Sequence, residues 1–397
     1  MKKLRYLALL LVAAFALSGC KVITINPDRD GAQVVAEVNG EKITKKQVYD
    51  AAGLTWDAKA DGYTTDNRKS MKSQAMESLI QDIVIKDKIK ELGYDKFNAD
   101  EEKEIADSLK TYRDNNYETI LKSYQEKAKT DPSIKPDESA EAAIKEYEQQ
   151  LRDNKALQKA KDAVIKDITA TDAEVQEMYS SILSAEKSAF DSDPSYISIY
   201  EMYYGYPIVY YPQDGYVRVK QILVKIPEDA QKEISSMREG NLTDEANKKR
   251  DEELKKIAAK AGDILTKVKA ASGDLAKLNG LITENNEDPG MTAESSGYLV
   301  YKDSKDYVQE FTDAAMALTD IGKPSELVAT DYGYHILWLS EKIAKGEVPL
   351  DQVKTKVTEL AVTNKQNEAW STTVTGWIDT LTKEKKIKTY AGRLNND

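Results

Sequence analysis

Alternating apolar residues begin the structured part of the chain. The segment 34–41 alternates as a short strand that runs into an Asn-Gly turn. Thr44 and Gln47 then match a capping box, so we expect a helix to begin directly after them. Apolar residues follow at helical spacing, and Gly93 is expected to end that stretch; they are Met76, Leu79, Ile80 and Ile83.

Helical patterning continues to about residue 190. The charged region 100–168 is predicted to be helical, with few chain breakers after Pro136. Two further pairs are typical of helix starts: Asn98 with Glu101, and Thr171 with Glu174. We therefore expect a mainly helical region over 34–190.

The hydrophobic period changes from helical to alternating at residue 217. One strand is predicted there, with a common face formed by Val217, Val219, Gln221 and Leu223. Helices are expected over 246–271 and 307–318, and a second strand over 334–339. These elements predict a separate αβ block over 217–345.

A helical pattern returns after Pro349. Four apolar residues recur with spacings of four, three and four, which places them on one stripe: Trp370, Val374, Trp377 and Leu381. We interpret the stripe as a core seam against the N-terminal helices. The fold class is then α+β, in which a helical module (34–190 and 346–397) carries the αβ block as an insertion.

Tyrosines crowd the connector over residues 191–216, together with Pro207 and Pro212. Tyrosine combines a large apolar face with a polar tip, which suits contact with varied peptides. The simpler interpretation is a loop that packs on its own domain, and we favour it.

The first twenty residues have the three parts of a secretory leader. A basic start with Lys2, Lys3 and Arg5 precedes an apolar stretch that is too short to span a bilayer, and small residues precede Cys20. The pattern resembles a bacterial lipobox, in which this cysteine is acylated. We therefore expect a signal peptide over 1–19, a lipid anchor at Cys20 and a tether over 20–33.

The charge of the chain limits its partners. The formal net charge is −11, and loss of the three basic leader residues makes it −14. Nucleic-acid binding needs stripes of Lys and Arg, so the acidic chain argues against that partner. Membrane attachment is expected to depend on the acyl chains at Cys20.

Catalytic chemistry of the common kinds is nearly excluded. The chain has one histidine, His335, and one cysteine, so it lacks the ligands of an ordinary zinc site. Gly-x-Ser-x-Gly and glycine-rich phosphate-binding motifs are absent. We expect neither a metal nor a cofactor. His335 and Gln221 lie on inward strand faces, and each is the expected hydrogen-bond partner of the other.

The αβ block resembles a parvulin-type (PpiC-type) peptidyl-prolyl isomerase domain. The resemblance rests on an ordered set of segments: 217–224, Asp288-Pro289-Gly290, Ser296-Gly297-Tyr298-Leu299, 308–318 and 330–336. The segment Val38-Asn39-Gly40-Glu41-Lys42-Ile43-Thr44 and the C-terminal helix resemble the PrsA and SurA foldases. This resemblance implies a small antiparallel sheet with helices, inserted in a chaperone module.

The resemblance also implies site residues. His335 matches one of the two core histidines of the family and Asp288 matches its Cys/Asp position, while Gln221 stands where the other histidine is usual. The implied proline pocket contains Leu299, Phe311 and Thr330, with Tyr307 where methionine is common. Gln221 and Tyr307 are thus departures from the family pattern, and the first could reduce activity.

Two hypotheses follow for the function. The first is a foldase, lipid-anchored at Cys20 on the extracytoplasmic face of a bacterial membrane, which isomerises X-Pro bonds in newly exported polypeptides. The alternative is a holdase whose αβ domain has lost catalysis. A solute-binding lipoprotein is disfavoured, since the alternating βαβ pattern is absent. Both a monomer and a homodimer remain open.

Overall fold

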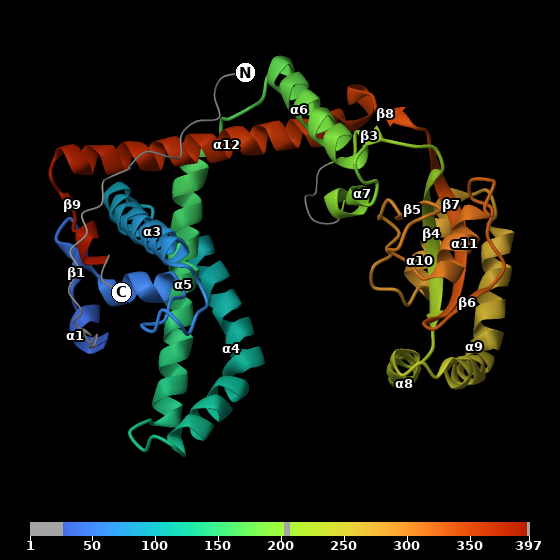
Figure 1. Cartoon of the computed structure of the whole chain (residues 1–397), viewed down its shortest axis with the longest axis horizontal. Coiled ribbons are helices and arrows are strands. Elements are labelled where there is room, and N and C mark those ends of the chain that lie inside the picture. Colours follow the sequence, from blue (N-terminus) through green and yellow to red (C-terminus); the bar gives the residue numbers. More distant parts are fainter. Residues whose placement is uncertain (1–26, 202–206, 395–397) are drawn as a thin grey trace. The chain divides into compact units, whose positions relative to one another are not determined.

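The computed structural model describes residues 27–201 and 207–394, which divide into two compact units (Figure 1). One unit holds the described residues up to Asp167 together with the described residues from Gln366 onward. The other holds Ile168–Lys365. The prediction that the two ends of the chain share a helical module around an inserted block agrees with this division, although the boundaries differ by about 20 residues on each side.

The first unit contains a three-stranded antiparallel sheet in the order β2-β1-β9. Its strands are β1 (Val34–Val38), β2 (Glu41–Thr44) and β9 (Ile387–Thr389). Asn39 and Gly40 both have positive φ, at 50° and 89°, which produces the tight turn expected from their sequence. The predicted tether contains a short helix, α1 (Pro27–Gly31), ahead of the sheet.

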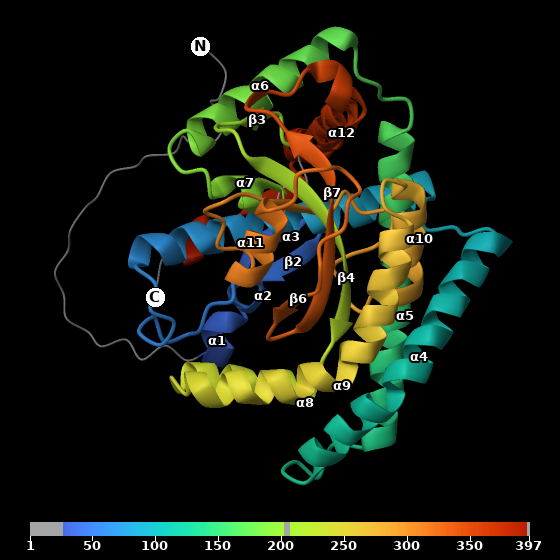
Figure 2. The ribbon, with the colours of Figure 1, turned by 90° about the vertical axis from the view of Figure 1, so that its right-hand side faces the viewer.

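Two helices pack beside this sheet, α2 (Lys45–Ala51) and α3 (Thr65–Leu92), while α5 (Pro136–Ile165) packs on α3 and α4 (Ala99–Ala128) packs on α5. The capping boxes of Thr44 and Asn98 are formed as predicted. Gly93 ends α3 in the left-handed conformation, with φ of 76°. Helices α4 and α5 form a long hairpin (Figure 2).

The end of the chain returns to the same unit. Helix α12 (Leu350–Lys383) buries Leu381 in a core shared with α3 and β1. Trp370 packs against Ile89 and Ala156. Its stripe is therefore a core seam, as its spacing predicts. Beyond β9, the turn η2 (Ala391–Leu394) is held by a 2.7 Å hydrogen bond from Lys72 Nζ to the carbonyl of Leu394.

The second unit contains a four-stranded antiparallel sheet in the order β5-β4-β7-β6, which confirms the predicted fold class. Its strands are β4 (Tyr216–Lys225), β5 (Tyr298–Val300), β6 (Val328–Thr330) and β7 (Gly333–Ile343). One face packs on α9 (Thr243–Ala270) and α10 (Leu275–Asn285), and the other on α11 (Gln309–Met316), as Figure 2 shows. A further helix, α8 (Glu228–Glu239), packs against α9.

The remaining elements of the second unit are α6 (Asp172–Phe190), α7 (Tyr196–Ile199), β3 (Tyr210–Tyr211) and β8 (Gly346–Glu347). Helix α6 packs on the first half of α12. The tyrosines of the connector that belong to the described residues mostly pack on this unit, in a cluster with β5; they include Tyr200, Tyr210, Tyr211 and Tyr216. The simpler interpretation of the connector thus holds for them.

None of the helices within 27–201 and 207–394 is both long and apolar enough to cross a membrane.

Glu186 of α6 is a fully buried carboxylate at the junction with β3. Its Oε2 accepts the backbone N–H groups of Val209 and Tyr210 at 2.8 and 3.0 Å, whereas Oε1 has no hydrogen-bond partner among the described residues. Burial raises the pKa of Glu186 from 4.5 to about 7, and the two backbone hydrogen bonds partly oppose this rise.

This raised pKa predicts a specific dependence of stability on pH. Between pH 4.5 and 7 the folded state keeps the proton that the unfolded state loses, so the contribution of Glu186 to stability falls as pH rises through this window. The free energy of unfolding of wild type, relative to Glu186→Gln, should fall by up to roughly 3 kcal/mol across it. Denaturant unfolding at several pH values measures the difference, and a difference independent of pH would contradict the prediction.

Candidate functional site

A cavity of about 830 Å³ opens on the α11 face of the four-stranded sheet. Side chains from β4, β5, β7, α11 and the loop before β5 converge on it. Its lining includes Gln221, Leu223, Asp288, Gly290, Met291, Tyr298, Leu299, Tyr307, Phe311 and His335. Six of the seven predicted site residues in the αβ block therefore lie around one cavity. Thr330 is the exception, because it lies behind His335.

A continuous chain of hydrogen bonds forms one side of this cavity. Gln221 Nε2 donates to Asp288 Oδ2 at 2.6 Å. Gln221 Oε1 lies 2.5 Å from His335 Nδ1, and His335 Nε2 lies 2.8 Å from Thr330 Oγ1. The predicted Gln221–His335 contact is thus present, and it is extended by one residue at each end.

The proton positions in this chain follow from its two ends. A carboxylate only accepts, so Gln221 must turn its NH₂ group to Asp288 and its carbonyl oxygen to His335. The Nδ1 of His335 must then donate, and Nε2 accepts from the Thr330 hydroxyl. The Tyr332 backbone N–H donates to Thr330 Oγ1 at 3.1 Å, which leaves the hydroxyl proton for His335.

His335 is neutral at ordinary pH. Burial lowers its pKa from 6.5 to about 4, and the Asp288 carboxylate only partly opposes this change. The side chain is 5% exposed, and Gln221 is 3% exposed. The buried pair is therefore a fixed set of dipoles over the physiological pH range.

Asp288 is positioned by its own loop. Gly290 N donates to Asp288 Oδ1 at 2.9 Å, and the Tyr298 hydroxyl donates to Oδ2 at 2.8 Å. Asn286 Oδ1 accepts from the backbone N–H of Asp288 and from that of Leu223 on β4. A Cβ at Gly290 would lie 2.4 Å from the Tyr298 hydroxyl, so a larger residue would push this hydroxyl away from Asp288.

Aromatic rings form the apolar side of the cavity. The Tyr307 centroid lies 5.3 Å from the rings of both Tyr298 and Phe311, and Phe311 meets His335 edge-to-face at 5.5 Å. Leu299 is 3% exposed and closes the wall on the β5 side. Tyr307, Phe311 and Leu299 thus form an apolar slot, and Asp288, Gln221 and His335 form a polar floor beside it.

Several residues in and around the site had no role predicted from the sequence. Tyr298 lies in a motif that indicated the family, but no role was predicted for it, and Asn286 lies two positions before Asp288. Ser198 and Glu201 also line the cavity, from a segment that precedes the αβ block. Because Ser198 and Glu201 are far in sequence from the other site residues, no sequence pattern linked them to the site.

Comparisons with known proteins agree with this architecture. A family model described as the PPIC-type PPIase domain matches residues 222–341, and one described as the SurA-like N-terminal domain matches residues 2–115. A foldase protein PrsA of Clostridium kluyveri is 25% identical, over 97% of this chain and 98% of the relative. One from Clostridium botulinum is 26% identical, over 99% and 98%.

The chain thus carries a PPIC-type PPIase domain and a SurA-like N-terminal domain, and it is similar over nearly its whole length to PrsA foldases. Solved structures similar to this PrsA-like chain include PrsA from Bacillus subtilis, at 18% identity over 89% of this chain and 93% of that one, with a TM-score of 0.29. PrsA from Streptococcus pneumoniae matches at 19% identity over 91% and 97%, with a TM-score of 0.27. The two family models and the PrsA relatives confirm the predicted resemblance.

Two other predictions concern a metal site and the N-terminal leader of this PrsA-like chain. Within the residues that the structure describes, no group of three or more His, Cys, Asp or Glu side chains is arranged to hold a metal ion. Cys20 and the leader lie outside the described residues.

The single histidine makes the hydrogen-bond chain directly testable. We expect the His335 imidazole to stay neutral from about pH 5 to 8, with its proton on Nδ1, since its pKa is lowered and Gln221 Oε1 accepts there. Nitrogen-15 NMR of the imidazole measures both properties. A midpoint near the ordinary value or a proton on Nε2 would contradict the assignment. Gln221→Leu, which removes the acceptor, should change the tautomer balance.

Proposed function

We propose that this chain is an extracytoplasmic, lipid-anchored foldase that isomerises X-Pro bonds in newly exported polypeptides. The observation that carries the isomerase part is the apolar slot of Tyr307, Phe311 and Leu299 beside the Asp288–Gln221–His335 chain. A proline ring is apolar and its preceding amide is polar, so the two sides of the cavity match the two parts of the substrate.

The reaction needs neither a nucleophile nor a net proton transfer. Rotation about the amide faces a barrier of ~18–20 kcal/mol, caused by resonance between its nitrogen and carbonyl. In the twisted transition state this resonance is lost, and charge returns to the nitrogen. A site lowers the barrier when it holds the ring and stabilises the twisted amide more than the planar one.

Each predicted residue has a place in this scheme. Phe311, Tyr307 and Leu299 would hold the ring, while Asp288, Gln221 and His335 would form fixed dipoles facing the rotating amide. Thr330 would act as a positioning residue, since it contacts His335 and lies outside the cavity wall. Because glutamine both donates and accepts, Gln221 keeps the chain continuous without a titrating group at that position.

The partners follow from the same proposal. Unfolded or newly exported polypeptides would be the clients, and acyl chains on Cys20 would hold the protein at the membrane. The formal net charge of −11 argues against nucleic acid as a partner. A homodimer is compatible with this function but is not required by it.

A non-catalytic holdase is the second candidate. It is favoured by one observation: the Tyr307 ring lies 5.3 Å from both Phe311 and Tyr298, so it occupies space beside the slot in which a proline ring would sit. A narrowed slot would leave client binding to the helical unit.

Isomerase activity and suppression of client aggregation can be measured separately on the full chain without its leader. Phe311→Ala should lower the acceleration of refolding limited by a trans-to-cis proline step by about tenfold or more, since it removes a wall of the slot. Suppression of client aggregation should be unchanged. The two measurements are proline-limited refolding and light scattering of an aggregating client.

The matched control is Phe97→Ala, which removes the same side chain from the other unit, where it lies beside Arg152 and Lys159. It should leave proline isomerisation unchanged. Wild-type protein that suppresses aggregation but does not accelerate proline-limited refolding would overturn the isomerase function and support the holdase.

The lipid anchor has its own test. Cys20→Ser should abolish incorporation of labelled fatty acid and move the protein from the membrane to the soluble fraction, because acyl chains would be the attachment. Labelling and fractionation of bacterial cells measure both effects. Continued membrane association of the unlabelled variant would show that another feature holds it there.

A further inference from the structure

One wall of the cavity comes from outside the isomerase domain. Ser198 of α7 and Glu201, two residues beyond it, line the cavity, whereas the PPIC-type match begins at residue 222. Both side chains lie on the side of the cavity next to Tyr307 and Asp306. They are additions to the site that the matched domain does not include.

Two polar contacts and one apolar contact hold this wall in place. Ser198 Oγ donates to Asp306 Oδ2 at 2.5 Å, and the Glu201 carboxylate pairs with Arg218 of β4 at 2.5 Å. Ile197 is fully buried in the apolar cluster beside β5. The wall is thus fastened to the sheet and to the loop before α11.

Negative charge exceeds positive charge at this end of the cavity. Glu201 and Asp306 line this end, and Lys305, which is exposed, is the one cation among the lining residues there, so one negative charge remains. Arg218, which pairs with Glu201 at 2.5 Å, does not line the cavity, and it lies 3.8 Å from a second carboxylate, Glu341. Asp306 accepts hydrogen bonds from neutral serine hydroxyls.

The surroundings of Tyr307 agree with this sign. Burial is the main cause that raises the pKa of the Tyr307 hydroxyl; the carboxylates of Asp306 and Glu201 add to the rise, and Arg218 partly opposes it. The other lining cation, Lys225, is at the far end of β4, where Glu287 accepts its backbone N–H. Asp288 contributes a further carboxylate to the floor.

We propose that Glu201 and Asp306 make the isomerase select substrates with a basic residue directly beside the proline. This inference rests on the proposed isomerase function. The Glu201 side chain is 32% exposed, so its carboxylate is accessible from the cavity while Arg218 fixes it. A lysine or arginine beside the proline gains a charge interaction that a partly desolvated wall strengthens, and a glutamate is repelled.

The test uses the full chain without its leader and two series of short peptides. Each series carries Lys, Ala or Glu, either directly before or directly after the proline, and isomerisation is followed by NMR exchange. In at least one series, kcat/KM for the Lys peptide should exceed that for the Glu peptide by about tenfold at low ionic strength. The ratio should shrink in 1 M salt, where the Debye length is about 3 Å.

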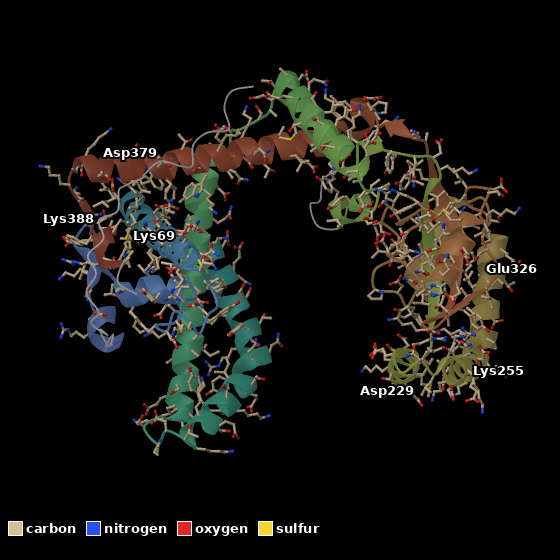
Figure 3. The ribbon with its side chains drawn as sticks, viewed as in Figure 1. Lys69, Asp229, Lys255, Glu326, Asp379 and Lys388 are labelled. Atoms are coloured by element: carbon tan, nitrogen blue, oxygen red, sulfur yellow. The ribbon has the colours of Figure 1, made fainter. Side chains whose placement is uncertain are left out.

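Glu201→Gln and Asp306→Asn should each lower this ratio to about threefold or less, while activity on the Ala peptide is retained. Glutamine can still accept from Arg218, so the first variant keeps the wall in place. The matched control is Glu326→Gln (Glu326 is labelled in Figure 3), which makes the same change of charge at a side chain that is 78% exposed. Glu326 pairs with Lys269 of α9. It should leave the ratio unchanged.

The outcomes distinguish this inference from the function on which it rests. Equal kcat/KM for the Lys and Glu peptides, with all peptides accelerated, would overturn the charge selection and leave the isomerase in place. An equal effect of Glu326→Gln and Glu201→Gln would also overturn it, because net charge alone would then explain the ratio. No acceleration of any peptide would overturn both proposals.

Discussion

The antiparallel pairing of β4 with β7 is the constraint on which the site depends. Gln221 pairs with Leu337 and His335 pairs with Leu223, so the two polar side chains lie diagonally on the same face of the sheet. A shift of register by one residue would turn one of them to the α9 face. With this register, Gln221 contacts Asp288 on one side and His335 on the other, so the three side chains of the polar floor are connected.

The same strand also holds the loop that carries Asp288. Asn286 Oδ1 accepts from Leu223 N, and Glu287 N donates to the Leu223 carbonyl, so the loop continues the hydrogen bonding of β4 beyond its short pairing with β5. From the opposite face, Lys220 Nζ donates to the carbonyl of Ala293 at 2.8 Å. The loop is therefore tied to β4 from its edge and from the face away from the cavity.

Local signals predicted the fold well, and contacts distant in sequence were harder to predict. The caps at Thr44, Asn98 and Thr171 depend on residues three apart, and all three formed as expected. The stripe containing Trp370 depends only on helical spacing. Helices α8 and α10 were missed, as was β9, whose place is set by pairing with β1 about 350 residues earlier. In the site, family motifs located the floor, but Glu201 could not be predicted, because its position depends on tertiary contact with Arg218.

Glutamine in place of histidine changes the electrostatics of the floor without breaking its geometry. In a chain of two histidines, either ring can carry the mobile proton, so the direction of the hydrogen bonds can reverse. Here Asp288 fixes the orientation of Gln221, and Gln221 fixes the tautomer of His335. The dipoles that face the cavity thus have one arrangement over the physiological pH range. Since amide rotation requires no proton to move, a floor with a single fixed arrangement suits that reaction better than a titrating one.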